Sequence, residues 1–371
     1  MRSKRVTDVT EQMEHDVTSE DQKEDMGPGK YSGPFIPTGS TMFNLACSDS
    51  PFGGFIPGTI VHAVGDSSTG KTFQAYTMFA EINRVKEFDD YLLIHDDVER
   101  ATDSINVPVL FGKSVAKRIQ APDYNKDGMP VYSDTIQDFY SNVWKLCEEG
   151  VPFVYVLDSL DSLTSDQELD RVEEMVSAHD KGKEAKGSFK AEKPKTLSEF
   201  LRVMKARLKE TKSLLMIISQ TRDNLEPMSH SKKTYTGGKA LKFYCYHEYW
   251  LMHLGAEKSG DKTIGNKTRI RISKNRVTGK KREIDFSIFD SYGLDDIGSM
   301  VDWLVKENIW KKDGKHVIDA QLKGVQLQFR RGALIDKIED DNLEDDLREF
   351  VGDEWKRIED SLKLDRKRKY K

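Results

Sequence analysis

A glycine-rich segment carries the residue types that bind a nucleoside triphosphate. The segment reads Gly65, Asp66, Ser67, Ser68, Thr69, Gly70, Lys71 and Thr72. This order matches G-x-x-x-x-G-K-[ST], whose backbone N–H groups converge on phosphates while a following helix adds its positive N-terminal end. Lys71 is expected to reach the β- and γ-phosphates, and the Thr72 hydroxyl to bind Mg²⁺. An ordinary glycine-rich turn is the alternative, but the predicted strand before the motif and helix after it favour ATP.

Side chains after other apolar stretches are candidates for the metal site and for hydrolysis. FVYVLD places Asp158 at the end of a predicted strand, where a P-loop protein needs a carboxylate for the metal. Hydrolysis needs a group that orients or deprotonates water, and Asp97 is the first choice and Glu99 the second. Gln220, at the end of LLMIIS, can sense a γ-phosphate and pass its presence to the next loop. Taken singly, Asp158 could cap a turn and Gln220 could bond to local backbone.

Short apolar stretches alternate with helical ones along the middle of the chain. The predicted strands are 59–64, 91–96, 153–158 and 214–219, and the predicted helices lie near 72–87, 134–149 and 196–211. Strands and helices in this order indicate βαβ units, and therefore an α/β fold with a mostly parallel sheet. Three later stretches, 243–254, 267–275 and 283–289, are expected to extend the sheet with antiparallel strands.

Composition divides the chain into three predicted regions. Residues 1–33 are polar and charged, and are expected to form a flexible N-terminal arm. Residues 34–332 contain the alternating strands and helices of the core. Residues 333–371 are acidic with a basic end, and their apolar residues recur at helical spacing, which predicts an amphipathic helix or helix pair.

Bulk properties limit the classes of function. The 371 residues have a net charge of −5, no apolar run near the ~20 residues that span a bilayer, and no secretory signal at the start. The three cysteines, Cys47, Cys147 and Cys245, lack paired spacing and are expected to be buried thiols. A cytoplasmic protein without a membrane partner is the natural expectation. Lysine-rich segments are separated from acidic ones, so the net charge does not exclude a nucleic-acid partner.

Two long polar segments follow the third and fourth predicted strands. Residues 165–196 include six lysines between 181 and 195, and residues 222–238 end in two glycines. Loops at the carboxyl ends of parallel strands are where ligands bind in open α/β sheets. Solvated surface loops are the simpler interpretation of either segment when it is considered alone.

The ordered series of motifs resembles the RecA family of recombinases, including its phage members, over about residues 36–310. The matching stretches are TGSTMFNLAC (38–47), GGFIPGTIVHAVGDSSTGKT (53–72), VLDSLDSLTS (156–165), LLMIISQTRDN (214–224), TYTGGKALKFY (234–244) and TRIRISKNR (268–276). The resemblance implies a RecA-type P-loop NTPase core that hydrolyses ATP with Mg²⁺. It also implies a homo-oligomeric helical filament on single-stranded DNA that pairs with double-stranded DNA during recombination and repair.

The resemblance also implies roles for particular residues. Thr72 and Asp158 match the metal positions, Gln220 the γ-phosphate switch, and Lys274 and Arg276 a basic pair that acts on ATP across a subunit boundary. The two polar segments match the family's DNA loops. The expected DNA contacts are Lys181, Lys183, Lys186, Lys190, Arg222, Lys232, Lys233, Gly237 and Gly238. Single-strand-binding or mediator proteins are candidate accessory partners.

Departures from the family keep other functions open. The family's catalytic glutamate falls on the shorter Asp97, with Glu99 as a substitute after a local shift, and no adenine-stacking tyrosine is evident in 101–118. A RecA-fold helicase motor is one alternative. A weakly hydrolysing ATP-binding recombination mediator is the other.

Overall fold

One mixed β-sheet runs through the unit formed by residues 34–371. The computed structural model describes residues 31–101, 105–180, 192–223, 233–236 and 238–366. The strands of this sheet are β1 (Thr59–Gly65), β2 (Leu92–Asp97), β5 (Phe153–Asp158), β6 (Leu214–Asp223), β7 (Lys233–Tyr235), β8 (His247–Ser259), β9 (Lys262–Asn275), β10 (Glu283–Phe289) and β11 (Gly293–Leu294). Their order is β11-β10-β9-β8-β1-β6-β5-β2, with β7 paired to β6.

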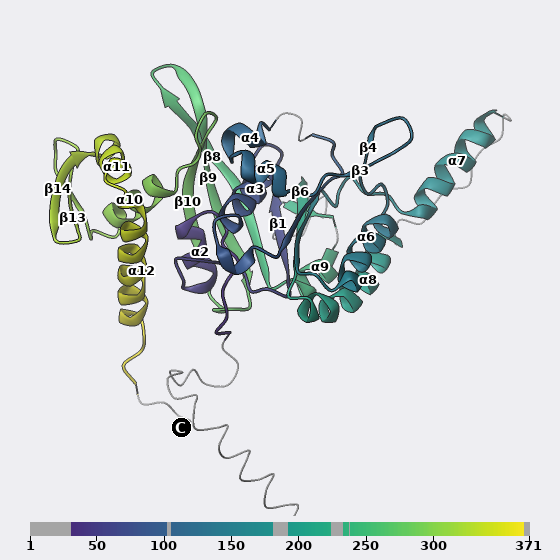
Figure 1. The fold of residues 1–371 in the computed structure, drawn as a ribbon, viewed down its shortest axis with the longest axis horizontal. Helices are drawn as coiled ribbons and strands as arrows, with labels where there is room; N and C mark the ends of the chain where they lie inside the picture. Colours follow the sequence, from purple (N-terminus) through teal and green to yellow (C-terminus); the bar gives the residue numbers. More distant parts are fainter. Residues whose placement is uncertain (1–30, 102–104, 181–191, 224–232, 237, 367–371) are drawn as a thin grey trace, which may run out of the picture. The chain divides into compact units, whose positions relative to one another are not determined.

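The strand directions confirm the predicted fold class. Strands β8, β1, β6, β5 and β2 are parallel to one another, whereas β9, β10 and β11 continue from β8 in antiparallel fashion and β7 pairs antiparallel with β6 (Figure 1). All seven stretches expected as strands contribute to this sheet. One of them differs at its start, because 243–254 begins inside a helix and becomes a strand only at His247.

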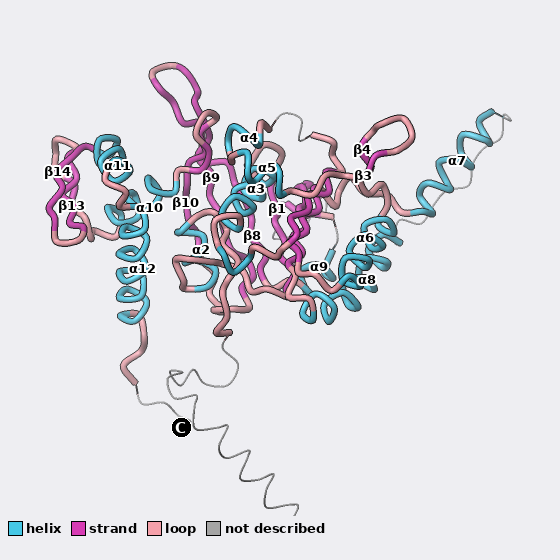
Figure 2. The backbone as a smooth tube through the Cα atoms, in the orientation of Figure 1, coloured by secondary structure: helices cyan, strands magenta, loops and turns pink. Residues whose placement is uncertain are grey.

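Helices cover both faces of the sheet because residues of each central strand alternate between two cores. In β5, Phe153, Tyr155 and Leu157 pack into one apolar cluster, while Val154 and Val156 pack into the other. The first cluster includes α6 (Ile136–Glu149), α8 (Glu192–Glu210) and α9 (Gly238–Tyr244), and the second includes α2 (Thr41–Ser48) and α3 (Lys71–Ile82). Figure 2 shows these helices on the two sides of the strands.

The first polar segment contains a helix that the sequence interpretation missed. Helix α7 spans Asp166–Asp180 and points away from the sheet (Figure 1). Its start is capped reciprocally, because Glu168 N donates to Ser165 Oγ (3.3 Å) and Ser165 N donates to Glu168 Oε2 (3.1 Å). The Ser-x-x-Glu spacing was present in the sequence, but the polar composition of the segment favoured a loop.

Smaller elements connect the main ones. They are η1 (Lys86–Phe88), α4 (Val107–Leu110), α5 (Lys113–Arg118), and the short β3 (Asp123–Tyr124) and β4 (Pro130–Val131). The three cysteines are free and buried, as predicted. Among the helices that the structure describes, none combines the length and the apolar character needed to cross a membrane.

The C-terminal region adds helices and a small sheet beside the core. Its elements are α10 (Asp296–Lys306), β12 (Lys311–Lys312), β13 (Val317–Leu322), β14 (Val325–Arg330), α11 (Arg331–Asp340) and α12 (Glu344–Ser361). The predicted amphipathic helices are confirmed, because Leu334, Leu347, Val351 and Trp355 are buried. The three-stranded sheet of β12, β13 and β14 was not anticipated.

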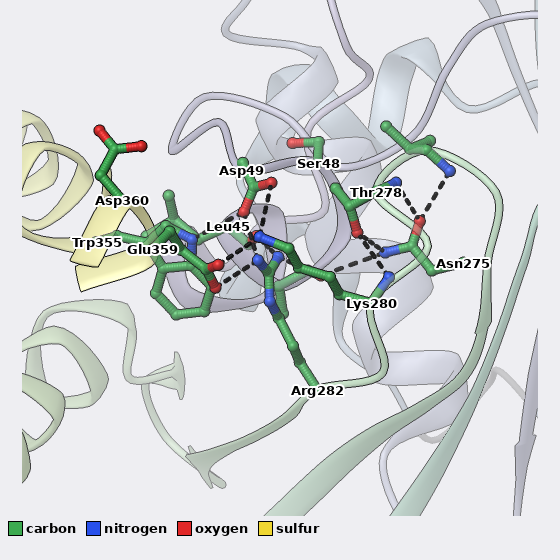
Figure 3. A network of polar contacts seen from close by, with 12 residues as sticks. Leu45, Ser48, Asp49, Asn275, Thr278, Lys280, Arg282, Trp355, Glu359 and Asp360 are labelled. Atoms are coloured by element: carbon green, nitrogen blue, oxygen red, sulfur yellow. Dashed lines mark hydrogen bonds and ion pairs between the residues drawn. The ribbon is translucent and has the colours of Figure 1, made fainter. Parts of the chain in front are cut away.

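A polar network fastens α12 to the core, and Figure 3 shows its members. The Arg282 guanidinium lies 2.6 Å from Asp49 Oδ1 and 2.5 Å from Glu359 Oε1. Lys280 pairs with the same Glu359, and Trp355 Nε1 donates to Asp49 Oδ1 (3.0 Å). Arg282 also lies over the Trp355 ring, with Cζ 4.8 Å from the ring centroid. The turn between β9 and β10 is therefore held between α2 and α12.

Candidate functional site

The glycine-rich segment forms the floor of a cavity at the carboxyl edge of the parallel strands. The cavity has a volume of about 430 Å³. Its lining comprises Ser67, Ser68, Thr69, Gly70, Lys71, Thr72, Phe73, Glu99, Ile105, Leu110, Asp158, Gln220, Asn266, Thr268, Ile288, Phe289 and Asp290. The predicted phosphate-binding, metal-binding and switch residues thus meet in one place. Gly65 and Asp66 lie where β1 ends and the turn begins.

The backbone of the predicted phosphate-binding turn adopts a left-handed conformation at Gly70. Gly70 precedes α3 with φ +91°, a conformation that favours glycine, and a Cβ there would also require the end of the Ile288 side chain to shift. Lys71 is buried, and its Nζ donates to the carbonyls of Gly65 (3.0 Å) and Asp66 (2.7 Å). Burial lowers the pKa of Lys71, while Asp158 and Glu99 oppose that shift. The ammonium is therefore held at the end of β1 by the loop itself.

Thr72 and Asp158 present oxygen atoms side by side. Thr72 Oγ1 donates a 2.5 Å hydrogen bond to Asp158 Oδ2. His95 Nε2 lies 3.6 Å from the same Oδ2, and Tyr76 OH lies 3.2 Å from His95 Nδ1. A hydroxyl and a carboxylate beside a phosphate-binding turn are the oxygen ligands that suit Mg²⁺, which keeps several waters and takes few protein ligands. The two residues therefore fit the expected metal.

Glu99, the second choice for the water-orienting group, lies at the cavity wall. Its Oε1 accepts hydrogen bonds from Ser159 Oγ (2.5 Å) and Gln220 Nε2 (2.7 Å). Asp97, the first choice, is 3% exposed and is not among the lining residues. Its Oδ1 accepts from Ala101 N (3.2 Å), which turns the chain after β2. The geometry therefore favours Glu99 over Asp97 for contact with bound nucleotide.

Part of the cavity lining is apolar. The apolar lining residues are Phe73, Ile105, Leu110, Ile288 and Phe289. The ring of Phe111, which is not among the lining residues, packs against Phe73 with ring centroids 5.0 Å apart. Within residues 101–118, where no adenine-stacking tyrosine was evident, the cavity lining thus includes the aliphatic Ile105 and Leu110. Such a surface can receive the flat face of a base.

Gln220 connects this cavity to the second polar segment. Its backbone N–H donates to Asp161 Oδ2 (2.7 Å), while its side chain bonds to Glu99. Asp161 also accepts from Thr236 Oγ1 (2.5 Å) and lies 3.3 Å from Arg222. One carboxylate therefore holds both ends of the segment that leaves β6 and returns through β7.

The glycine-rich turn also touches this segment directly. The Asp66 carboxylate contacts Thr221 Oγ1 and Lys233 Nζ, and the pKa of Asp66 is lowered by the hydrogen bond from Lys233 and then by that from Thr221. Arg222 and Lys233 lie on the paired strands β6 and β7, and Gly238 begins α9. The other expected DNA contacts, Lys181, Lys183, Lys186, Lys190, Lys232 and Gly237, lie outside the described residues.

The predicted basic pair lies away from the cavity of its own chain. Lys274 Nζ donates to the carbonyls of Lys242 and Phe243 (2.9 Å to the latter), and Arg276 donates to Phe243 O (2.7 Å). These carbonyls end α9, where cations are favoured by the helix dipole. Neither Lys274 nor Arg276 is among the residues that line the cavity.

Comparison with known proteins decides the family. Residues 30–295 match the family described as the RecA N-terminal domain. This chain belongs to the RecA family. Proteins named RecA from Colwellia psychrerythraea and Methylococcus capsulatus are 28% and 29% identical over 279 residues, which cover 75% of this chain and 72% of each relative. The RecA of Corynebacterium urealyticum is 30% identical over 279 residues, with 75% of this chain and 67% of that protein covered.

The RecA family match contains every predicted site residue, since all of them lie within 30–295. It ends before the C-terminal helices α11 and α12. Two polar residues inside it were overlooked in the sequence, Asp161 and Glu248. Asp161 lies three residues after Asp158 in VLDSLDSLTS, and this repeat could have indicated a second functional carboxylate. Glu248 lies in a predicted strand, where its neighbours in sequence do not reveal its contacts.

Proposed function

We propose that this protein is an ATP-dependent DNA recombinase that forms filaments on single-stranded DNA and promotes pairing and strand exchange with double-stranded DNA. The observation that carries the proposal is the position of Gln220. Its side chain lines the phosphate cavity, and its strand continues into the segment 222–238. This position supports a connection between the occupancy of the cavity and the conformation of that segment.

In this function the cavity binds ATP. The backbone of residues 65–70 cradles the phosphates, Lys71 turns from the loop carbonyls to the β- and γ-phosphates, and the apolar lining residues receive the base. Thr72 and Asp158 hold Mg²⁺, which neutralises charge on the phosphates. Glu99 orients the attacking water, and its two hydrogen-bond donors, Ser159 and Gln220, fix the carboxylate.

The DNA contacts belong to the two polar segments. Arg222 and Lys233 have side chains that are 61% and 46% exposed, so both can exchange their carboxylate partners for phosphates of DNA. Lys181, Lys183, Lys186, Lys190 and Lys232 are proposed to contribute further phosphate contacts.

Lys274 and Arg276 are proposed to act on the ATP of a neighbouring copy. Their position off the cavity of their own chain supports a shared site, in which cations from one subunit neutralise charge that develops on the γ-phosphate of the next. A helical filament of identical subunits repeats this arrangement at every interface.

A titration of ATP turnover with single-stranded DNA tests the function. Turnover is expected to rise with DNA in the wild-type protein and to be absent from Lys71→Ala, and negative-stain images with ATP and DNA are expected to contain filaments. Turnover without DNA stimulation and without filaments would contradict the proposal. Tight ATP binding with negligible turnover would favour a mediator, and rings of fixed subunit number would favour a helicase motor.

A further inference from the structure

Glu248 is a buried carboxylate outside the ATP cavity that is surrounded by polar side chains. It is 0% exposed and lies on β8. A charge in this environment is costly unless it is paired and hydrogen-bonded. Its partners are Tyr235 OH (2.6 Å), Ser273 Oγ (2.5 Å), Lys242 Nζ (3.1 Å), Trp250 Nε1 (3.4 Å) and His62 Nδ1 (3.5 Å).

These hydrogen bonds keep the carboxylate ionised. Burial acts to raise the pKa of Glu248, but the contact with His62 and the hydrogen bonds from Ser273 and Tyr235 outweigh it and hold the pKa well below its usual value. Burial and the bond to Glu248 raise the pKa of Tyr235, so its hydroxyl remains a donor. A charged acceptor with neutral donors makes stronger hydrogen bonds than a neutral pair does.

Two of the partners belong to the second polar segment and to the helix that follows it. Tyr235 is the last residue of β7 and lies near the end of the segment 222–238 that is proposed to contact DNA. Its ring packs edge-on against His62, with centroids 4.7 Å apart. Lys242 lies in the last turn of α9, and its carbonyl is one of the two that accept hydrogen bonds from the basic pair.

A third partner belongs to the strand that carries the basic pair. Glu248 is opposite Lys274 in the β8–β9 ladder, while the next residue, Tyr249, is opposite Ile272. Ser273 is therefore the extra residue of a β-bulge, a feature that re-aims a side chain. Ser273 Oγ donates to both the side chain and the backbone carbonyl of Glu248. The carboxylate thus fixes the residue next to Lys274.

We propose that Glu248 is a positioning residue that couples DNA contact in the segment 222–238 to the placement of Lys274 and Arg276. If DNA draws Tyr235 away, the buried carboxylate loses a strong donor and must shift toward its remaining partners, because an unmet buried charge is expensive. Ser273 and Lys242 then move with it, and the basic pair moves with them. This inference rests on the function proposed above.

The test compares two substitutions that remove the coupling with one that does not. Glu248→Gln keeps the shape but removes the charge, and Tyr235→Phe removes only the hydroxyl that donates to it. Glu257→Gln is the control, since Glu257 lies on the same strand and accepts from Ser287 Oγ (2.6 Å) instead. Each variant is assayed for ATP-analogue binding, for ATP turnover without DNA, and for turnover saturated with single-stranded DNA.

Glu248→Gln and Tyr235→Phe are expected to lose about fivefold or more of the DNA stimulation, with ATP-analogue affinity and DNA-free turnover within about twofold of wild type. The double variant should be no worse than Glu248→Gln, because both changes break one connection. Tyr235→Phe keeps the test decisive if Glu248→Gln fails to fold. Full stimulation in Tyr235→Phe, or an equal loss of turnover with and without DNA, would overturn the inference. Absence of stimulation in the wild-type protein would instead contradict the proposed function itself.

Discussion

The side-chain amide of Gln220 donates a 2.7 Å hydrogen bond to Oε1 of Glu99 at the wall of the phosphate cavity. The same oxygen accepts from Ser159, so two donors, one directly after β5 and one within β6, fix one carboxylate. Gln220 is also bound through its backbone to Asp161, which holds both ends of the segment 222–238. The group proposed to orient water and the segment proposed to bind DNA therefore share one residue.

This relationship predicts which carboxylate matters for turnover. Glu99→Gln should lower ATP turnover by about 100-fold or more, because a positioned general base contributes a factor of that order, with ATP binding preserved. Asp97→Asn should cost far less, since Asp97 is buried beneath the turn after β2. Steady-state ATPase rates and nucleotide affinities of the two variants measure the difference. A larger loss in Asp97→Asn than in Glu99→Gln would return Asp97 to the catalytic role.

A mixing experiment tests whether ATP is shared between copies. Lys71→Ala removes the cation that reaches phosphates within one chain, and Lys274→Ala removes the cation proposed to reach the neighbour's ATP. Each variant alone should be nearly inactive. A mixture of the two should regain turnover, because some interfaces then combine an intact cavity with an intact basic pair. Lys274→Ala alone with wild-type turnover would show that the pair does not act in hydrolysis.

The network around Arg282 should contribute to stability. Arg282 is 10% exposed and bonds to Asp49, Glu359 and a carbonyl of α2, so Arg282→Ala should lower the free energy of unfolding by about 1–3 kcal/mol. Arg357→Ala is the control on α12, because Arg357 is exposed and, in the part of the chain that the structure describes, pairs with Glu354 one turn away. Urea denaturation compares the two. Equal midpoints for both variants would show that the network does not fasten α12.

Acid should destabilise the fold through His247. Burial lowers the pKa of this fully buried histidine from 6.5 to about 4, so it stays neutral in the folded state where the unfolded chain binds a proton. Stability is therefore full above about pH 6.5 and falls as the pH drops toward 4, by about 2 kcal/mol between pH 7 and pH 5. His62, whose pKa is also lowered by burial, acts in the same direction.

Urea unfolding at the two pH values measures this loss in the wild type and in His247→Gln. The variant should show a smaller loss, whereas His316→Gln, in which an exposed histidine is replaced, should behave like the wild type. An unchanged pH dependence in His247→Gln would contradict the assignment.

The sequence predicts several of the residues that line the cavity, because these residues lie at or directly after the ends of predicted strands. The glycine-rich turn, Asp158 and Gln220 each lie at the end of a strong apolar stretch, and parallel strands bring such ends to one edge. Whether Asp97 or Glu99 reaches the cavity depends on how the chain turns after β2. The residue types around these two positions do not determine that turn. Helix α7 was missed because its composition is polar, although Ser165 and Glu168 supply a capping box.

Contacts between elements distant in the chain lay beyond the reach of sequence patterns. Asp66 meets Lys233, and Glu248 gathers Tyr235, Lys242 and Ser273, only after the sheet has formed. A charged residue in a strand is usually assigned to the exposed face, so its burial at Glu248 has no local signature.

Nucleotide in the cavity is proposed to control the affinity for DNA through Gln220. This control can be measured by fluorescence anisotropy of a labelled single-stranded oligonucleotide, with a non-hydrolysable ATP analogue and with ADP. The analogue is expected to tighten DNA binding by about tenfold or more in the wild type, and Gln220→Ala is expected to remove most of this difference. Equal DNA affinity with both nucleotides, or an undiminished difference in Gln220→Ala, would contradict it.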